Sequence, residues 1–112
     1  MSIFGEATRN RQRREMMIAV IAKLTAKPGH EDELGAALTD GAAKVLAGEP
    51  GCLLYRVARS RSDTGVYTLM EIYASQAALD AHPNAPHFEE IRTALSAHLG
   101  AAPEVEFLDA LN

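Results

Sequence analysis

The chain has 112 residues, a mass of 12.0 kDa and a formal net charge of −4, which suits one domain with its own hydrophobic core. Its one cysteine, Cys52, excludes an intrachain disulfide and a metal site built from cysteines. No apolar run approaches the ~18 residues of a membrane span and no secretory leader is evident, so we expect a cytoplasmic protein with no membrane partner.

The first 15 residues differ in charge from the rest. They contain four arginines and two glutamates, whereas residues 16–112 contain seven basic and thirteen acidic residues. An arginine cluster can be a nucleic-acid arm or a targeting sequence, but an acidic body repels a phosphate backbone. Tryptophan is absent and aromatic residues make up 5%, which leaves little material for stacking bases. We therefore expect a flexible basic extension over 1–15, a folded domain over 16–112, and no nucleic-acid partner.

The first predicted elements are a strand and a helix. Residues 17–24 are apolar and partly β-branched, which is typical of a strand. Residues 30–47 repeat apolar side chains at intervals of three and four, which indicates an amphipathic helix. Gly48 is expected to end this helix in a left-handed conformation.

A hairpin is predicted next. Residues 52–59 and 66–73 have strand character, and the polar segment 60–65 between them contains a turn-forming glycine. Simple alternation along the first of these strands places Cys52 and Tyr55 on opposite faces of the sheet.

The second helical region is interrupted by proline. Ser75 is expected to cap a short helical turn through Ala81, and Pro83 breaks it because the residue before a proline is pushed out of helical geometry. Asn84 is expected to cap a second helix over 85–99.

With a last strand at 104–108, the order becomes βαββαβ. This is the α+β, ferredoxin-like plan, in which an antiparallel sheet carries both helices on one face. The strands, however, are apolar on both faces, whereas a solvated face would alternate with polar residues. Two helices cover only one face, so we expect a homodimer packed sheet to sheet.

Four segments of the sequence together form a recognisable motif set: residues 27–31, 49–55, 69–75 and 78–88. In this order and spacing, over about residues 17–109, the chain resembles the antibiotic biosynthesis monooxygenase (ABM) domain family, and its quinol monooxygenases in particular. The resemblance implies a ferredoxin-like fold and a dimeric α+β barrel. It also implies oxidation of a quinol or an electron-rich phenol by molecular oxygen, with no metal, flavin or haem cofactor.

Other functions stay open at this point. Related family members isomerise small phosphorylated ketones, and a further alternative is a non-catalytic stress-response dimer that binds a small molecule. Some relatives degrade haem, but Tyr73 stands where the family often has tryptophan, which weakens roles that use an indole.

His82 and His87 are the first candidate catalytic residues, because they match the family's His-x4-His-Phe pattern on either side of the proline break. Histidine is the side chain best suited to proton transfer near neutral pH. One of them would remove a proton from the phenol or quinol, and the anion then gives an electron to oxygen more readily. The alternative is that both only form hydrogen bonds within the loop.

Glu71 is the third candidate, because it lies in an otherwise apolar strand and an unpaired buried carboxylate is costly. It matches the family's glutamate and would orient a histidine, or else it pairs with Arg56 or Arg59 in the neighbouring strand. The candidate contacts to an aromatic substrate, which could instead be core residues, are Tyr73, Phe88, Tyr55 and Tyr67.

A metal site is not expected from the sequence. His87 and Glu90 share a helix face at i,i+3, but the sequence offers no third ligand beside them, and the His-Glu-x-x-His spacing is absent.

Overall fold

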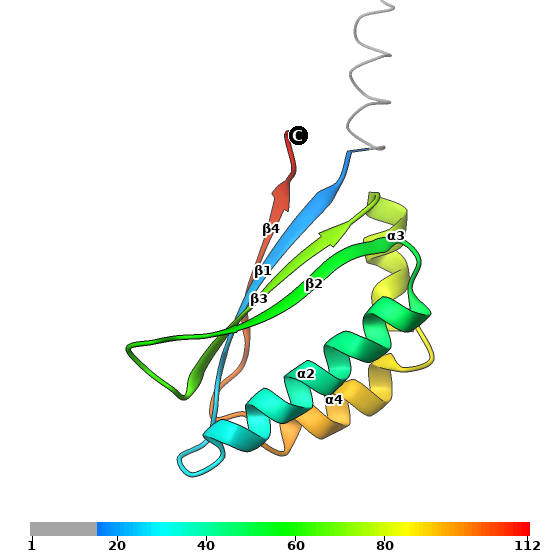
Figure 1. Cartoon of the computed structure of the whole chain (residues 1–112). Helices are drawn as coiled ribbons and strands as arrows, with labels where there is room; N and C mark the ends of the chain where they lie inside the picture. The colour runs from blue at the N-terminus through cyan, green and yellow to red at the C-terminus, as the bar shows by residue number, and fades with distance from the viewer. Residues whose placement is uncertain (1–15) are drawn as a thin grey trace, which may run out of the picture.

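A four-stranded antiparallel sheet, in the order β2-β3-β1-β4, carries the helices on one face (Figure 1). The computed structural model describes residues 16–112, so the expected basic extension over 1–15 lies outside the described residues. The elements are β1 (Ile18–Thr25), α2 (Glu31–Gly48), β2 (Cys52–Arg59), β3 (Val66–Tyr73), α3 (Gln76–Ala81), the 3-10 helix η1 (His82–Asn84), α4 (Phe88–Ser96) and β4 (Glu104–Asp109). The ferredoxin-like prediction is confirmed. Within residues 16–112, no helix combines the length and the apolar character needed to cross a membrane.

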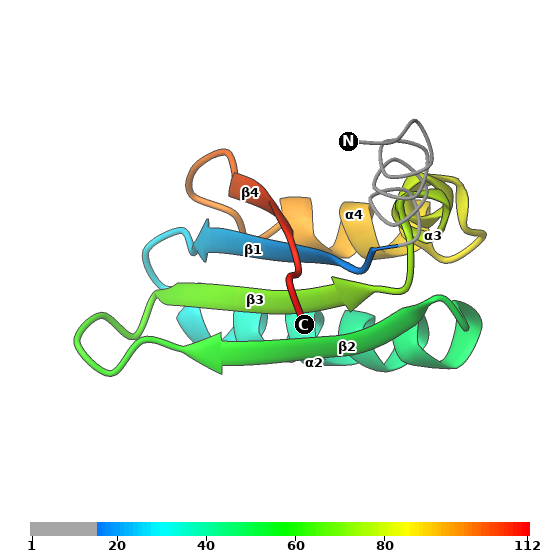
Figure 2. The ribbon, with the colours of Figure 1, turned by 90° about the horizontal axis from the view of Figure 1, so that it is seen from above.

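The two central strands, β1 and β3, pair along their whole length, with Ile18 opposite Tyr73 and Thr25 opposite Val66. The edge strand β4 pairs with β1, and the edge strand β2 pairs with β3. Seen from above, α2 and α4 lie behind the sheet (Figure 2). One face of the sheet is therefore covered and the other is open.

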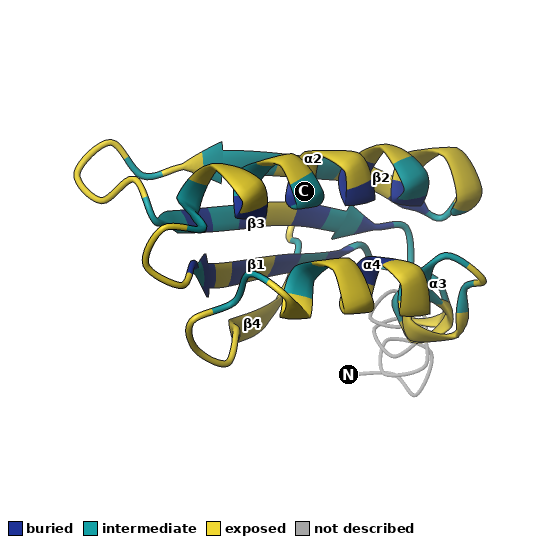
Figure 3. Cartoon of the chain, turned by 90° about the horizontal axis from the view of Figure 1, so that it is seen from below, coloured by how far each residue is buried: buried dark blue, intermediate teal, exposed yellow. Residues whose placement is uncertain are grey.

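The covered face holds the core, which divides into two clusters of buried side chains. One cluster is centred on Leu34, Leu38 and Leu69, and the other on Val45 and Tyr73. Seen from below, the outward faces of both long helices are exposed, whereas their sheet-facing sides are buried (Figure 3). Each fully buried leucine or valine contributes roughly 1.5–3 kcal/mol through the hydrophobic effect.

The open face is also apolar. Ile21, Leu54, Met70 and Leu108 are each between 36% and 38% exposed. Ile21 lies opposite Met70 and Leu54 lies opposite Ile72, so these side chains form an apolar patch, with Glu106 and Arg56 at its two sides. This arrangement explains the two-sided apolar pattern of the sequence, while the homodimer itself stays a prediction.

A β-bulge between Cys52 and Leu54 changes which residues of β2 face the helices. Cys52 lies opposite Tyr73, and Tyr55 lies opposite Glu71, so Cys52 and Tyr55 share the covered face. The prediction that they lie on opposite faces is wrong, because one extra residue in a strand shifts the phase of the alternation.

Gly48 is the last residue of α2 and does not adopt the predicted left-handed conformation. Within the described residues, the only glycine with a positive φ is Gly29, at 86°. A Cβ at Gly48 would lie 2.9 Å from both Cε1 and Nδ1 of His87. Glycine is therefore needed at this position because the ring of His87 packs closely against the helix, and not because the backbone turns here.

The helix α4 is shorter than the predicted span of 85–99. Asn84 does not cap it, because its Nδ2 donates to the carbonyl of Asp80 at 3.3 Å, and His87 occupies the N-cap position. At the other end, Leu99 forms an isolated bridge with Ala26. The chain leaves the helix there to enter β4.

Candidate active site

A cavity of about 660 Å³ lies between the sheet and the segment formed by α3, η1 and the start of α4. Small-molecule sites typically enclose about 300–1,000 Å³. The apolar lining residues are Ile18, Val20, Ala22, Leu79, Pro83, Phe88, Val105, Phe107 and Leu108. The polar lining residues are Glu71, Gln76, Asp80, His82 and Asp109, so none of the described lining residues is a lysine or an arginine.

The strands β1 and β4 form one side of the cavity. Val20 lies opposite Phe107 and Ala22 opposite Val105, so these side chains point to the same face of the sheet. Every residue of β4 is exposed, and Phe107 is 64% exposed although it is aromatic. The cavity thus has an apolar side that the helices leave uncovered.

The short elements α3 and η1 form the opposite side. Ser75 Oγ accepts a hydrogen bond from the amide of Ala78 at 3.1 Å, which confirms the predicted cap and fixes where α3 begins. The chain then tightens into η1, with Pro83 in its first turn. This junction places His82 against the cavity.

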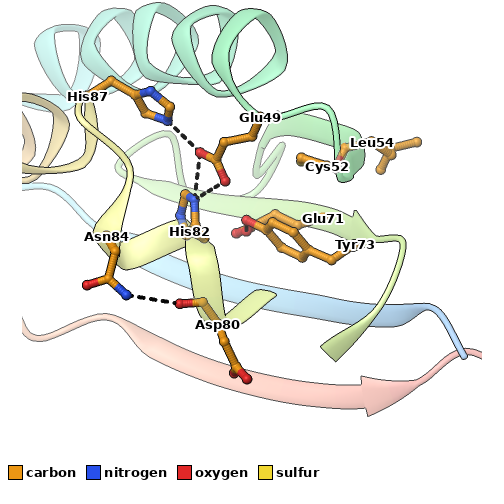
Figure 4. A network of polar contacts seen from close by, with 9 residues as sticks. All are labelled: Glu49, Cys52, Leu54, Glu71, Tyr73, Asp80, His82, Asn84 and His87. Carbon is orange, nitrogen blue, oxygen red and sulfur yellow. Dashed lines mark hydrogen bonds and ion pairs between the residues drawn. The ribbon is translucent and has the colours of Figure 1, made fainter. Parts of the chain in front are cut away.

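His82 and His87 meet at one carboxylate, that of Glu49 (Figure 4). His82 Nδ1 lies 2.9 Å from both carboxylate oxygens, and His87 Nε2 lies 2.5 Å from Oε2. The Glu49 side chain is 10% exposed, and the two imidazoles are 15% and 14% exposed. An ionised carboxylate only accepts hydrogen bonds, so both imidazoles donate to it. The nitrogen of His82 that keeps a free lone pair is therefore Nε2.

His87 plays a different part from His82 in this arrangement. It is not among the residues that line the cavity. Its ring lies between the carboxylate of Glu49 and the backbone of Gly48. The structure thus places only one of the two predicted histidines against the cavity, while both contact Glu49.

Three of the predicted aromatic contacts surround His82. The ring centroid of Phe88 is 5.2 Å from that of His82 in an edge-to-face arrangement, Tyr73 is at 5.5 Å and Tyr55 at 6.5 Å. Phe88 lines the cavity, whereas Tyr73 is fully buried. Tyr55 and Tyr73 therefore pack against His82 but do not line the cavity.

Tyr67 lies elsewhere. Its hydroxyl donates to the carbonyl of Glu31 at 2.9 Å, and its ring belongs to the core cluster of Leu34 and Leu38. Arg59 lies over the ring, 5.3 Å from the centroid. The structure does not bring Tyr67 to the cavity.

Glu71 lines the cavity and is 7% exposed. Its Oε1 accepts a hydrogen bond from the hydroxyl of Tyr73 at 2.7 Å. Burial raises the pKa of Glu71, and the hydrogen bond from Tyr73 and the charge of His82 partly offset this effect. The site therefore holds a carboxyl group that takes up a proton more readily than an exposed one.

The alternative ion pair between Glu71 and an arginine of β2 is not formed. Arg59 Nη2 pairs instead with Asp32 Oδ1 at 2.9 Å. Arg56 lies opposite Met70, on the open face of the sheet, and so cannot reach Glu71 on the covered face.

Cys52 is buried beside this site, and its Sγ donates to the carbonyl of Leu54 at 3.4 Å. Burial, together with the charges of Glu49 and Glu71, raises the pKa of its thiol to about 11. The thiol therefore stays protonated at neutral pH and is unsuited to act as a nucleophile.

Glu49 is the residue of the site that sequence reasoning missed. It lies 33 residues before His82 and 38 before His87, so no local spacing connects it with them. The predicted neighbour of His87, Glu90, pairs with Lys44 at 2.6 Å instead. The ligand atoms of Glu49, His82 and His87 lie within 4.8 Å of one another and could hold a metal ion. The third ligand that the sequence did not reveal is thus Glu49.

Comparisons with known proteins agree with this fold. The family model described as "Antibiotic biosynthesis monooxygenase" matches residues 17–94. A candidate antibiotic biosynthesis monooxygenase of Caulobacter crescentus is 37% identical, covers 94% of this chain and 99% of its own, and superposes with a TM-score of 0.82. The PA3566 protein of Pseudomonas aeruginosa is 30% identical, covers 88% of this chain and 98% of its own, and superposes with a TM-score of 0.78. A candidate antibiotic biosynthesis monooxygenase of Chloroflexus aurantiacus is 27% identical, covers 86% of this chain and 94% of its own, and superposes with a TM-score of 0.75. A search of curated proteins gives no match.

Proposed function

This chain belongs to the antibiotic biosynthesis monooxygenase family, and from that premise we propose that it oxidises a quinol or another electron-rich phenol with molecular oxygen. The family and its neighbours support a monooxygenase-like function in general. One observation carries the choice of substrate. The cavity is walled by apolar side chains, contains His82 and Glu71, and has no lysine or arginine among its described lining residues.

The walls of the cavity suit a flat, uncharged ring. Phe88 and Phe107 offer aromatic faces, and Val20, Leu79 and Val105 add aliphatic surface. A phenolic hydroxyl entering this space finds polar partners at His82 and Glu71. Apolar pockets with a few convergent polar groups are the usual form of small-molecule sites.

His82 acts as the base in this proposal. Its Nδ1–H is held by Glu49, so Nε2 accepts the phenolic proton, and the carboxylate stabilises the imidazolium that forms. The phenolate passes one electron to O2, the phenoxyl radical and superoxide combine at a ring carbon, and the imidazolium of His82 returns its proton to the resulting peroxide to give a hydroperoxide. Loss of water then cleaves the O–O bond: one oxygen atom stays on the ring as a carbonyl, so that a phenol becomes a quinone and a quinol becomes a hydroxyquinone, and the other oxygen atom leaves as water. The chemistry uses no cofactor.

The same cavity disfavours a phosphorylated ketone as substrate. A phosphate group is normally bound by arginine, lysine or backbone amides. The charged residues along this cavity are instead acidic, namely Glu71, Asp80 and Asp109, apart from any charge on His82. They would repel a dianion. The isomerase is therefore the weaker candidate.

We also propose that the open face of the sheet binds a second copy of this chain. The side chains of Ile21, Leu54, Met70 and Leu108 give this face an apolar surface that a monomer would expose to water. A second sheet packed on it, about 10 Å away, would bury that surface. Light scattering that gives the mass of a single chain at micromolar concentration would contradict this.

The test of the proposed activity is the oxidation of menadiol and other quinols, followed by oxygen uptake and by quinone absorbance. We expect a rate above that of buffer and a loss of that rate in His82→Ala. A rate equal to that of buffer for every quinol would refute the oxygenase. Binding of a quinol without oxygen uptake would favour the non-catalytic alternative.

A further inference from the structure

We propose that Glu49, His82 and His87 bind a divalent transition metal ion, Zn²⁺ in the first instance. Each residue offers one ligand atom, a carboxylate oxygen, Nδ1 of His82 and Nε2 of His87, and these atoms lie within 4.8 Å of one another (Figure 4). Imidazole and carboxylate are ligands that zinc takes in proteins, most often with three residues and one exchangeable position.

The spacing of the ligand atoms suits such an ion after a small adjustment. Zinc–ligand distances near 2.0–2.1 Å put neighbouring ligand atoms about 3.3 Å apart in a tetrahedral site. The distances from Glu49 to the two histidine nitrogens are 2.9 Å and 2.5 Å. The carboxylate oxygens therefore have to move away from the two histidine nitrogens by less than about 1 Å, while the two nitrogens already lie within 4.8 Å of each other.

The three residues come from different parts of the fold, which gives the site its rigidity. Glu49 follows α2 as its C-cap residue, His82 begins η1, and His87 is the N-cap residue of α4. The side chains are 10–15% exposed, so the site is nearly closed but still reachable by an ion. The bound ion would tie together three segments that are joined here by hydrogen bonds and by the packing of Val45, Leu79 and Ile91.

The surrounding charge also favours a cation. Glu49 forms no ion pair with a lysine or an arginine in residues 16–112. Glu71 is a second buried carboxyl group, and it lines the same cavity as His82. In the part of the chain that the structure describes, neither Glu49 nor Glu71 forms an ion pair with a lysine or an arginine. Nitrogen ligands select zinc and its transition-metal neighbours over magnesium and calcium.

The experiment titrates the metal-free full-length chain with ZnCl₂ by calorimetry, and with Co²⁺ while recording its absorption spectrum. We expect one ion per chain and the intense visible bands of a four-coordinate cobalt site. Glu49→Gln and His87→Ala should each lower the affinity for zinc by at least about tenfold. Removing a residue that only hydrogen-bonds to a metal ligand already costs about 10–100-fold in metal affinity. Circular dichroism of each variant checks that it is folded.

The chain offers its own control. His30 and His98 form a second histidine pair, with their Nδ1 atoms 3.0 Å apart, but no third ligand joins them within residues 16–112. The double variant His30→Ala/His98→Ala should bind zinc as the parent does. Absence of zinc binding by the parent, binding that survives Glu49→Gln, or binding that is lost with His30 and His98 would each overturn the proposal. A zinc ion on Nδ1 of His82 would leave the ring proton on Nε2, so the zinc-bound chain should not oxidise a quinol through His82, and the proposed oxidation belongs to the metal-free chain. Because zinc binding is measured without substrate and quinol oxidation without zinc, failure of one proposal is distinguished from failure of the other.

Discussion

His82 Nδ1 lies 2.9 Å from both carboxylate oxygens of Glu49, although 33 residues separate the two in the chain. The contact holds one nitrogen of the imidazole as a donor and leaves the other as an acceptor. It also sets the orientation of a ring that packs against Phe88 and lines the cavity.

Glu49→Gln should slow quinol oxidation through kcat more than through KM. The glutamine amide still accepts a hydrogen bond from an imidazole, but it no longer stabilises the imidazolium formed during proton transfer. His82→Ala should cost roughly 10²–10⁴ in rate, the usual contribution of a positioned base, and Glu49→Gln should cost less. Glu90→Gln is the matched control, because this exposed glutamate pairs only with Lys44. Equal losses in Glu90→Gln and Glu49→Gln would argue against the role of Glu49.

Gly48→Ala should lower the free energy of unfolding by about 1–3 kcal/mol, the usual cost of inserting a methyl group into occupied space. The new Cβ would lie 2.9 Å from the ring of His87. Urea denaturation measures the effect. In a double-mutant cycle, Gly48→Ala should cost less when His87 is already alanine. An equal cost in both backgrounds would mean that the ring is not the obstacle.

Cys52 should resist alkylation in the folded protein. Burial disfavours the thiolate and raises the pKa from 9.0 to about 11, so the reactive fraction at mildly alkaline pH falls about a hundredfold. The rate of iodoacetamide labelling, followed by mass spectrometry, should keep rising until the pH approaches that value. The urea-unfolded chain is the reference, and labelling at the same rate in both states would contradict the prediction.

Glu71→Gln should make the protein more stable at neutral pH. Burial raises the pKa of Glu71 in the folded state above its ordinary value of 4.5. Folding therefore favours the protonated form, and stability falls as the pH rises from 4.5 through the folded-state pKa. The variant cannot ionise at this position and should lose that part of the pH dependence, while its amide oxygen still accepts from Tyr73. Urea denaturation over this pH range, with exposed Glu104→Gln as control, provides the measurement. If the free energy of unfolding of Glu71→Gln and of the parent changed with pH in the same way, the prediction would be contradicted.

Met70→Lys should convert the proposed dimer to monomers. Met70 is 37% exposed on the open face and lies opposite Ile21, so a lysine there would place a charge in the middle of the sheet-to-sheet contact. Leu46→Lys is the control, because Leu46 is 48% exposed on α2, away from this face. The mass of each variant by light scattering decides the matter. The same mass for Met70→Lys as for the parent would place the interface elsewhere.

The regular part of the fold could be predicted from local patterns. The strands β2 and β3 coincide with the predicted ranges 52–59 and 66–73, because their composition and the polar segment between them are local signals. The bulge at Cys52 was not predictable, since it arises from the register with β3. Gly48 shows the same limit, because its local context suggests a turn, whereas the contact that requires glycine comes from His87.

The candidate site also contains residues that the sequence predicts and residues that it does not. His82 and His87 could be picked from a short segment around the proline break. Glu49 could not, because its role depends on the C-terminus of α2 packing beside η1. The surroundings of Glu71 likewise depend on which face of β2 the arginines occupy, and the bulge determines that face. Long-range packing decides both.

The position of β4 has a consequence for biosynthesis. One side of the cavity is formed by β1 near the start of the described chain and by β4 at residues 104–109. A ribosome releases β1 long before β4 is made, so a nascent chain holds an unpaired edge on β1 that could pair with other chains. The cavity becomes complete only when β4 docks against β1. Binding competence is therefore reached only after β4 has been synthesised, and loss of β4 alone would remove it.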